Sequence, residues 1–417
     1  MAAPSIAVRQ VTSPVAAFGS REFRIFWLGF IAYSVTSGMQ TVALGWLTVQ
    51  LAARDGVPER GSLYLGLVGL SAALPGLALG LFGGVIADRR DRRVLLVLTQ
   101  AGYAATGLAL GLLTATDRIG LVSLLILAAI MSAASAFWHP ARQAIQPRLV
   151  GEERVMSAFG LNALALNVGL LVGPLLGGFL IGPIGIAGVL IASGLAYAFV
   201  ALVYLALAPQ PVSGEARQVN VLAALAVGLS YVRDEPSVRW LTLLFAAATF
   251  LVRPYTDLLP AVATGLGTDA VGLSRLVAGV GAGSLLAGLV TAFAARIPRK
   301  GLAVAGGYVA CGAALTVLAT RADVGAAFVT VVALSFFLML SSGLVGALLQ
   351  YTTPDHLRGR VVGVQTLLIG GGMPLGTLAL GAIGSVAGIG PTLVLAGGLL
   401  AAIALGAFLV PALRREI

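Results

Sequence analysis

The chain has 417 residues, of which 59% are hydrophobic and 10% are charged, and its mean hydropathy is +1.00. Soluble domains carry about 25% charged residues, so this composition excludes a soluble globular protein and indicates an integral membrane protein. The formal net charge of +10 does not indicate a nucleic-acid partner, because the basic residues are spread over short segments between apolar runs and form no single patch.

Apolar runs recur along the whole chain, and each is long enough to cross about 30 Å of hydrocarbon as a helix of about 20 residues. A membrane barrel would instead show short strands of alternating hydrophobicity, which the sequence lacks. We therefore expect an all-α integral membrane protein with twelve transmembrane helices. The expected spans cover residues 25–50, 63–87, 94–115, 119–139, 157–181, 186–208, 238–262, 271–294, 301–319, 325–349, 361–386 and 391–411.

The first expected span carries polar side chains at helical spacing, namely Tyr33, Ser37, Gln40 and Thr41. Residues with this spacing share one helix face, and a polar face is unfavourable against lipid. One interpretation is a water-filled cleft that binds substrate, and the other is hydrogen bonding between helices. His139, which precedes a proline at the inner end of the fourth span, is instead expected in a loop. The same two interpretations apply in later spans to Asn162, Asn167, Ser341, Ser342 and Gln365.

A charged segment, Gly84 to Arg93, separates the second span from the third. A charge at the centre of a bilayer costs about 2.5–3.5 kcal/mol, so we expect this segment to form a loop. The Asp88 carboxylate at the end of the second span can pair with loop arginines and with the positive N-terminus of a neighbouring helix. The alternative is that arginines such as Arg89 and Arg92 only set the topology.

The fifth span contains a run of glycines from Gly169 to Gly178, with Pro174 in its middle. Glycines let helix backbones approach closely in a membrane, and proline removes a backbone hydrogen bond. Close helix packing is therefore expected here. A further interpretation is a bend that seals against a neighbouring helix and prevents leakage.

The longest polar stretch between spans, residues 209–237, separates the sixth span from the seventh. Part of it, residues 219–232, is amphipathic, so we expect a cytoplasmic linker with one helix lying on the membrane surface. The linker divides the chain into two six-helix bundles, residues 1–208 and 238–417. An internal repeat supports this division, because basic residues recur at one constant spacing in both bundles. The pairs are Arg89 with Arg296, Arg92 with Arg299, and Arg93 with Lys300.

Asp257, in the seventh span, is the one acidic residue that we place well inside a span. Arg253 lies four residues earlier on the same helix face, and Pro254 and Pro260 interrupt the helix around them. Ionisable residues inside a membrane indicate a functional site. Asp257 can carry a coupling proton, and Arg253 can bind an anionic substrate or keep Asp257 ionised. The alternative is a structural ion pair near the outer surface.

The arginines set the expected orientation of the spans. With the N-terminus inside, most of the 26 basic residues fall in inner segments, in agreement with the positive-inside rule. Both termini are then cytoplasmic, and the arginine-rich composition favours a bacterial plasma membrane. The exceptions, in outer segments or at outer span ends, are Arg54, Arg60, Arg118, Arg253, Arg275 and Arg321.

The charged loop resembles the loop signature of the major facilitator superfamily. The matching residues are Gly84, Asp88, Arg89, Arg92 and Arg93. This resemblance implies a latch that joins the second and eleventh spans and holds one access state. The residue at position 91 is an aspartate where the family usually has a second glycine, so the turn can differ in backbone shape.

The glycine run in the fifth span is similar to the superfamily's antiporter motif, which is associated with exporters. Its residues are Gly169, Gly173, Pro174, Gly177 and Gly178. Three shorter segments, residues 23–27, 147–150 and 354–361, resemble the drug:H+ antiporter branch. That branch includes enterobactin exporters and macrolide or tetracycline efflux pumps.

Together these features predict a secondary transporter of the major facilitator fold and not an enzyme. The sequence has no ATP-binding loop and no nucleophile elbow, and its single cysteine, Cys311, excludes an internal disulfide. We expect proton-coupled export of a bulky amphipathic molecule, such as a drug, a siderophore or a secondary metabolite, by alternating access. The alternative is a nutrient or lysolipid facilitator or flippase without proton antiport. The expected partners are a small-molecule substrate, protons and the lipid bilayer, with no nucleic acid, cofactor or metal, and the chain is expected to be a monomer.

Overall fold

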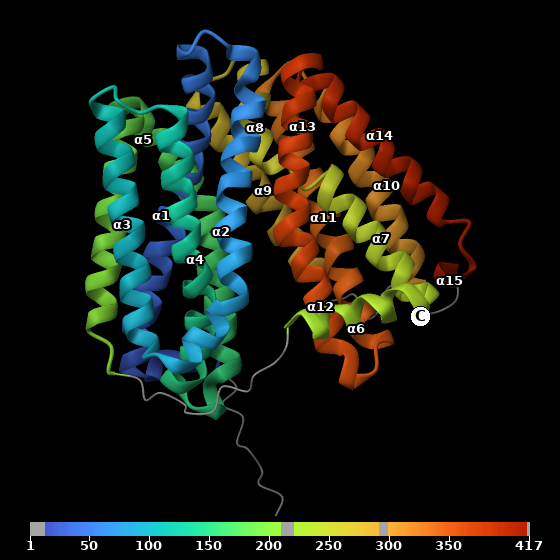
Figure 1. The fold of residues 1–417 in the computed structure, drawn as a ribbon, viewed down its shortest axis with the longest axis horizontal. Coiled ribbons are helices and arrows are strands. Elements are labelled where there is room, and N and C mark those ends of the chain that lie inside the picture. The colour runs from blue at the N-terminus through green and yellow to red at the C-terminus, as the bar shows by residue number, and fades with distance from the viewer. Residues whose placement is uncertain (1–12, 210–220, 292–298, 415–417) are drawn as a thin grey trace, which may run out of the picture.

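The computed structural model describes residues 13–209, 221–291 and 299–414, without the side chains of residues 81–89, 221–224, 412 and 414. These residues form helices and no strand (Figure 1). The α-helices are α1 (Arg21–Arg54), α2 (Gly61–Arg89), α3 (Arg92–Ala115), α4 (Leu121–Val150), α5 (Val155–Leu205), α6 (Val221–Asp234), α7 (Pro236–Leu251), α8 (Tyr255–Gly265), α9 (Ala270–Thr291), α10 (Lys300–Leu318), α11 (Val324–Thr352), α12 (Asp355–Leu367), α13 (Met373–Ala387), α14 (Ile389–Ala407) and α15 (Pro411–Arg414).

Nine helical stretches in the described chain are long and apolar enough to cross a membrane. A tenth is added if the bent pair Leu225–Asp234 and Pro236–Gly265 counts as one span. The stretch Glu152–Leu205 counts once, although it covers two of the expected spans. Helix α1 is not among the nine, because its polar side chains lower its hydropathy. The all-helical membrane architecture is confirmed, and the number of twelve spans stays a prediction.

Several of the long helical stretches are interrupted at residues that cannot continue a regular helix. Gly185 divides α5 with a φ of 70°, a left-handed conformation that glycine adopts without steric cost. Pro254, which has no backbone N–H, lies in the break between α7 and α8. A π-helical turn, Leu368–Gly372, joins α12 to α13. Such turns occur often at functional sites.

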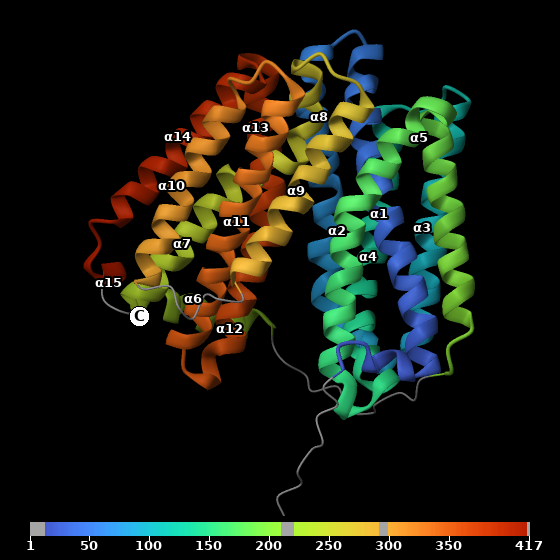
Figure 2. The same cartoon turned by 180° about the vertical axis from the view of Figure 1, so that it is seen from behind.

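The helices gather in two groups, α1–α5 and α7–α14, which Figures 1 and 2 show from opposite sides. The groups lie against each other at the upper end of Figure 1 and diverge toward the lower end. Helices α6 and α12 lie together at this lower end. The segment Leu225–Asp234 is turned by 111° from the stretch Pro236–Gly265, as expected for a helix that lies on the membrane surface.

Helices α1 and α5 pack backbone to backbone through glycines. A Cβ atom on Gly173 would lie 2.5 Å from the carbonyl oxygen of Val35 and 2.8 Å from the Cα of Gly38. A Cβ atom on Gly169 would lie 2.6 Å from the backbone of Ser34. Because real Cβ contacts are longer, only glycine permits this separation of the two helices. Contact of this kind is a main source of helix association in lipid.

The two groups of helices meet through α2 with α13 and through α5 with α9. Ser62 Oγ of α2 donates a hydrogen bond to the Gly381 carbonyl of α13 at 2.9 Å. Close by, a Cβ atom on Gly66 would lie 2.7 Å from the Cα of Leu378. A Cβ atom on Gly281 of α9 would lie 2.9 Å from the Leu170 carbonyl of α5. Glycine therefore allows close contact between the groups as well as within them.

The α1–α5 contact predicts that alanine lowers the stability of the protein at one glycine of α5 and not at another. Gly173→Ala should lower the free energy of unfolding by about 1–3 kcal/mol, because the added methyl overpacks the contact with α1. Gly182→Ala is the matched control, since a Cβ atom there would meet no atom within 4 Å. Thermal unfolding in detergent should show a lower midpoint for Gly173→Ala only. Equal midpoints would contradict the contact.

Candidate functional site

Asp257 lies half-buried in the first turn of α8. Its Oδ2 accepts a hydrogen bond of 2.9 Å from the Thr377 hydroxyl. Thr377 belongs to α13 and is fully buried, so this bond connects two helices of the second group. Sequence reasoning selected Asp257 and missed Thr377, because nothing in the sequence separates this threonine from those that bond only their own helix.

Arg253 lies in the break between α7 and α8 and is half-buried. No acidic side chain in the described residues lies within 4.0 Å of its guanidinium, Asp257 included. Its electrostatic neighbours are the hydroxyls of Tyr308 and Tyr255, and its buried Nε has no hydrogen-bond partner. The ion pair with Asp257 that the sequence spacing allowed is therefore not formed, since Asp257 is bonded to Thr377.

The polar face of α1 makes contacts within its own group of helices. Gln40 is buried, and its Oε1 accepts a hydrogen bond of 2.9 Å from Tyr197 of α5. The ring of Tyr33 lies 4.0 Å from the ring of Trp138 of α4, centre to centre. Thr41 is exposed and donates to the Ser37 carbonyl one turn earlier. Hydrogen bonding between helices thus accounts for Gln40, while Thr41 remains available to a cleft.

Arg142 of α4 was not selected from the sequence, because α4 continues to Val150 through two internal prolines. The expected end of the fourth span at residue 139 was wrong, and His139 lies in the helix and not in a loop. Neighbouring helices make prolines tolerable within membrane helices. The Arg142 guanidinium lies 4.8 Å from the ring centre of Phe30 and 5.1 Å from that of Trp138, within the range of cation–π attraction.

The predicted latch is only partly described. Gly84 lies within α2, and the side chains of Asp88 and Arg89 at the end of this helix are outside the described part of the structure. Arg92 is buried at the start of α3, and the carboxylate of the preceding aspartate caps α3 by accepting from the Arg93 N–H at 2.9 Å. The Arg93 guanidinium donates to a carbonyl in the last turn of α5, where a cation is favoured. The latch to the eleventh span stays a prediction.

The expected antiporter motif faces two different helices. Gly169, Gly173 and Gly177 face α1. Gly178 faces α9 in the other group, where an added Cβ would lie 2.5 Å from Ser274 Oγ. Pro174, beside them, is buried. The motif therefore packs mainly within its own group and reaches the other group through Gly178, and a gating role remains a prediction.

The remaining cleft candidates are scattered among three helices. Asn162 is buried in α5, and neither atom of its side-chain amide has a hydrogen-bond partner among the described residues. Asn167 donates to the Ala163 carbonyl of the same helix at 2.9 Å. Ser341 of α11 is buried without a partner for its hydroxyl, while Ser342 and Gln365 are half-buried. The structure does not gather these residues into one site.

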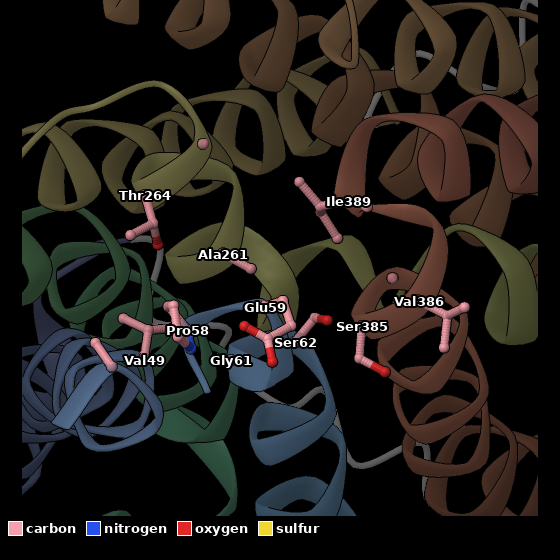
Figure 3. Close-up of a pocket in the computed structure, with 14 residues that line it drawn as sticks. Val49, Pro58, Glu59, Gly61, Ser62, Ala261, Thr264, Ser385, Val386 and Ile389 are labelled. Atoms are coloured by element: carbon pink, nitrogen blue, oxygen red, sulfur yellow. The ribbon is translucent and has the colours of Figure 1, made fainter. Parts of the chain in front are cut away.

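A pocket of about 340 Å³ opens at the end where the two groups meet. Figure 3 shows Glu59, in the turn just before α2, and Ser62, in the first turn of α2, in the same pocket as Ser385 of α13. Glu59 is its only ionisable lining residue in the described chain. A second pocket, of about 460 Å³, lies between α2 and α12 near the diverging end. Its lining is mostly apolar and consists of Ala73, Gly76, Leu77, Gly80, Leu225, Gly363, Thr366, Leu367 and Gly370.

Comparisons with known proteins indicate transport. A family model described as transmembrane secretion effector matches residues 12–416. The multidrug efflux pump Tap of Mycolicibacterium fortuitum is 26% identical over 367 residues, which cover 85% of this chain and 87% of Tap. The enterobactin exporter EntS of Shigella boydii is 30% identical over 340 residues, which cover 77% of each chain.

Solved structures of low identity share the fold. A bacterial homologue of the human lysosomal transporter Spinster, in an inward-facing and occupied conformation, has a TM-score of 0.72 at 16% identity and covers 94% of this chain and 97% of that one. The nucleoside transporter NupG has a TM-score of 0.71 at 11% identity and covers 91% of this chain and 99% of that one.

Replacement by phenylalanine is expected to lower the stability of the protein at one buried tyrosine of α5 and not at another. Tyr197→Phe should lower the free energy of unfolding by about 1 kcal/mol, because it leaves the buried Gln40 carbonyl without a partner. Tyr204→Phe should leave stability unchanged or raise it, since the fully buried Tyr204 hydroxyl has no hydrogen-bond partner. Unfolding in detergent checks both variants. An equal loss in the two would show that the Gln40 bond adds nothing.

Proposed function

The chain belongs to the transmembrane secretion effector family of the major facilitator superfamily, and we propose that it exports a bulky amphipathic molecule in exchange for protons. It is an efflux or secretion transporter of this superfamily and not an enzyme. The names of the relatives, a multidrug efflux pump and an enterobactin exporter, support a drug, a siderophore or a secondary metabolite as substrate.

The proposal includes the membrane topology. Twelve spans with both termini in the cytoplasm of a bacterial cell place α6 and α12 at the inner face of the plasma membrane. Two six-helix bundles, residues 1–208 and 238–417, then move relative to each other about the linker 209–237. The distribution of arginines supports this orientation.

The contact between the two groups of helices is the observation that carries the proposal. In the proposed orientation this contact is at the outer end, and the groups diverge toward the cytoplasm, as an inward-facing transporter requires. The described outer contact consists largely of glycine against backbone, with the hydrogen bond from Ser62 to Gly381. Few favourable polar interactions are lost when such a contact opens, so alternation between two access states is feasible.

Asp257 is the proposed proton carrier. Its carboxylate is half-buried within the membrane-spanning region, and its hydrogen-bond partner there is a neutral hydroxyl, that of Thr377. Because Arg253 does not neutralise it, a change of protonation changes the charge of the site. That change of charge supports coupling between proton binding and the conformation of α8 and α13.

Lysolipid transport without proton antiport is the second candidate. The pocket of about 460 Å³ between α2 and α12 favours it, because apolar side chains and glycines dominate its lining. Such a pocket between the two groups suits an acyl chain that enters from the inner leaflet.

Proton antiport predicts a substrate-dependent collapse of the pH gradient in inside-out vesicles with an acid interior. Addition of an exported compound should dissipate the gradient with the unmodified protein. With Asp257→Asn the response should fall to that of vesicles without the protein, because the amide cannot carry a proton. Asp117→Asn is the matched control, since Asp117 is an exposed carboxylate paired with Arg54.

Two results would contradict parts of this proposal. Collapse that persists in Asp257→Asn would place the proton carrier elsewhere. A panel of cationic drugs, siderophores and organic anions without any response would contradict antiport, and lysolipid flipping would then be measured.

Alternating access predicts that a disulfide across the outer contact stops transport. A Cβ atom on Gly384 would lie 3.4 Å from the Cβ of Ser62, close to the spacing of about 3.5–4.5 Å in disulfides. The double variant Ser62→Cys with Gly384→Cys should therefore lose transport on oxidation and regain it on reduction. Each single variant is a control, and the native Cys311 is buried. Full transport by the oxidised double variant would mean that this end does not open.

A further inference from the structure

Positive charge in the candidate site is not balanced by negative charge. Arg253 and Arg142 both lie within long helical stretches, and no acidic side chain in the described chain lies within 4.0 Å of either one. The acidic residue nearest in sequence to Arg253 is Asp257, which is bonded to Thr377. Charged groups within membrane spans normally pair with each other or mark a transport pathway.

Arg253 lies close to the middle of its span and not at the outer span end expected from the sequence. At a rise of about 1.5 Å per residue, it lies about 25 Å from the start of α7 and about 18 Å from the end of α8. The two helices together are about 13 Å longer than a hydrocarbon layer about 30 Å thick, so Arg253 lies within this layer. The residue is half-buried and therefore partly accessible. An arginine inside the layer needs a partner for its charge there.

The polar groups around Arg253 are hydrogen-bond donors without strong acceptors. The hydroxyls of Tyr255 and Tyr308 are buried beside the hydroxyls of Ser335 and Ser342, respectively, and neither makes a hydrogen bond of regular geometry among the described residues. The Nε of Arg253 is also buried and unpartnered. Buried polar groups are normally satisfied, so the unpartnered Nε of Arg253, with two weakly bonded tyrosine hydroxyls near it, indicates a missing acceptor. An anionic group fits best, because hydrogen bonds from arginine to an anion are short and strong.

We propose that the exported molecule is an organic anion and that Arg253, Tyr255 and Tyr308 bind its charged group. This inference rests on the proposed export function and narrows its substrate class. A cationic group would meet the uncompensated guanidinium of Arg253, whereas an anionic group compensates it.

The test compares 2-naphthoate with 2-naphthamide, which share one ring system and differ in charge. Purified full-length protein in detergent is heated with each compound, and binding to the folded state raises the unfolding midpoint. Naphthoate should bind about tenfold or more tightly than the amide. Arg253→Gln should remove this preference, and Arg321→Gln, which changes an exposed arginine between α10 and α11, should keep it.

Two further variants separate a binding role from a structural role. Tyr308→Phe should change the stability of the empty protein little, because the lost hydroxyl makes no hydrogen bond of regular geometry, yet weaken naphthoate binding about fivefold to tenfold. Arg253→Lys keeps the charge without the planar fork and should retain a weaker preference for naphthoate. This variant also provides the test if Arg253→Gln fails to fold.

Three outcomes would overturn the inference: equal stabilisation by naphthoate and naphthamide, no stabilisation by either compound, or an equal loss of preference in Arg253→Gln and Arg321→Gln. The measurement needs no proton gradient, so it is independent of the vesicle experiment. Asp257→Asn should still prefer naphthoate. If the unmodified protein shows this preference but exports no compound, the export function alone is overturned, and if it exports a compound without showing the preference, the anion site alone is overturned.

Discussion

Close contact between helix backbones at glycine is the constraint on which the rest of this structure depends. In lipid the hydrophobic effect does not drive helices together, so packing and hydrogen bonds must hold them. Gly38 and Gly173 allow α1 and α5 to touch, and Gly66 and Gly281 allow the two groups of helices to touch. The same chemistry therefore serves a contact within one group and the contact between the groups, which the proposed alternating access would open.

The polar groups of the site depend on this packing for their positions. Asp257 and Thr377 come from helices far apart in sequence, and α13 must lie against α8 for their bond to form. Arg253 lies where α7 ends and α8 begins, so the break that Pro254 enforces also sets the depth of its charge. The interruption between α7 and α8 therefore decides where the intramembrane charge of Arg253 lies.

Hydropathy and charge predicted the positions of the helices well, because lipid imposes one simple requirement on each span. The expected limits of the second, third, ninth and tenth spans agree with α2, α3, α10 and α11 to within a few residues. The fourth span was too short, since Pro140 and Pro147 look like helix ends while the neighbouring helices tolerate them.

The partners of the polar side chains were not predictable in the same way. The pairing of Gln40 with Tyr197, and of Asp257 with Thr377, depends on how helices rotate against one another. Hydropathy carries no information about that rotation. The same limit applies to Arg253 and Asp257, which share a helix face by spacing but have separate surroundings.

The depth of Arg253 has an electrical consequence. A molecule held there is within the membrane potential, and one elementary charge that moves through 100 mV changes in free energy by about 2.3 kcal/mol. In a cell that is negative inside, an outgoing anion and an incoming proton both move down this potential, and their contributions add. The potential alone would then sustain a concentration ratio of about 50 for each charge moved. An exporter of this kind would be electrogenic. The membrane potential would drive export even where the pH differs little across the membrane.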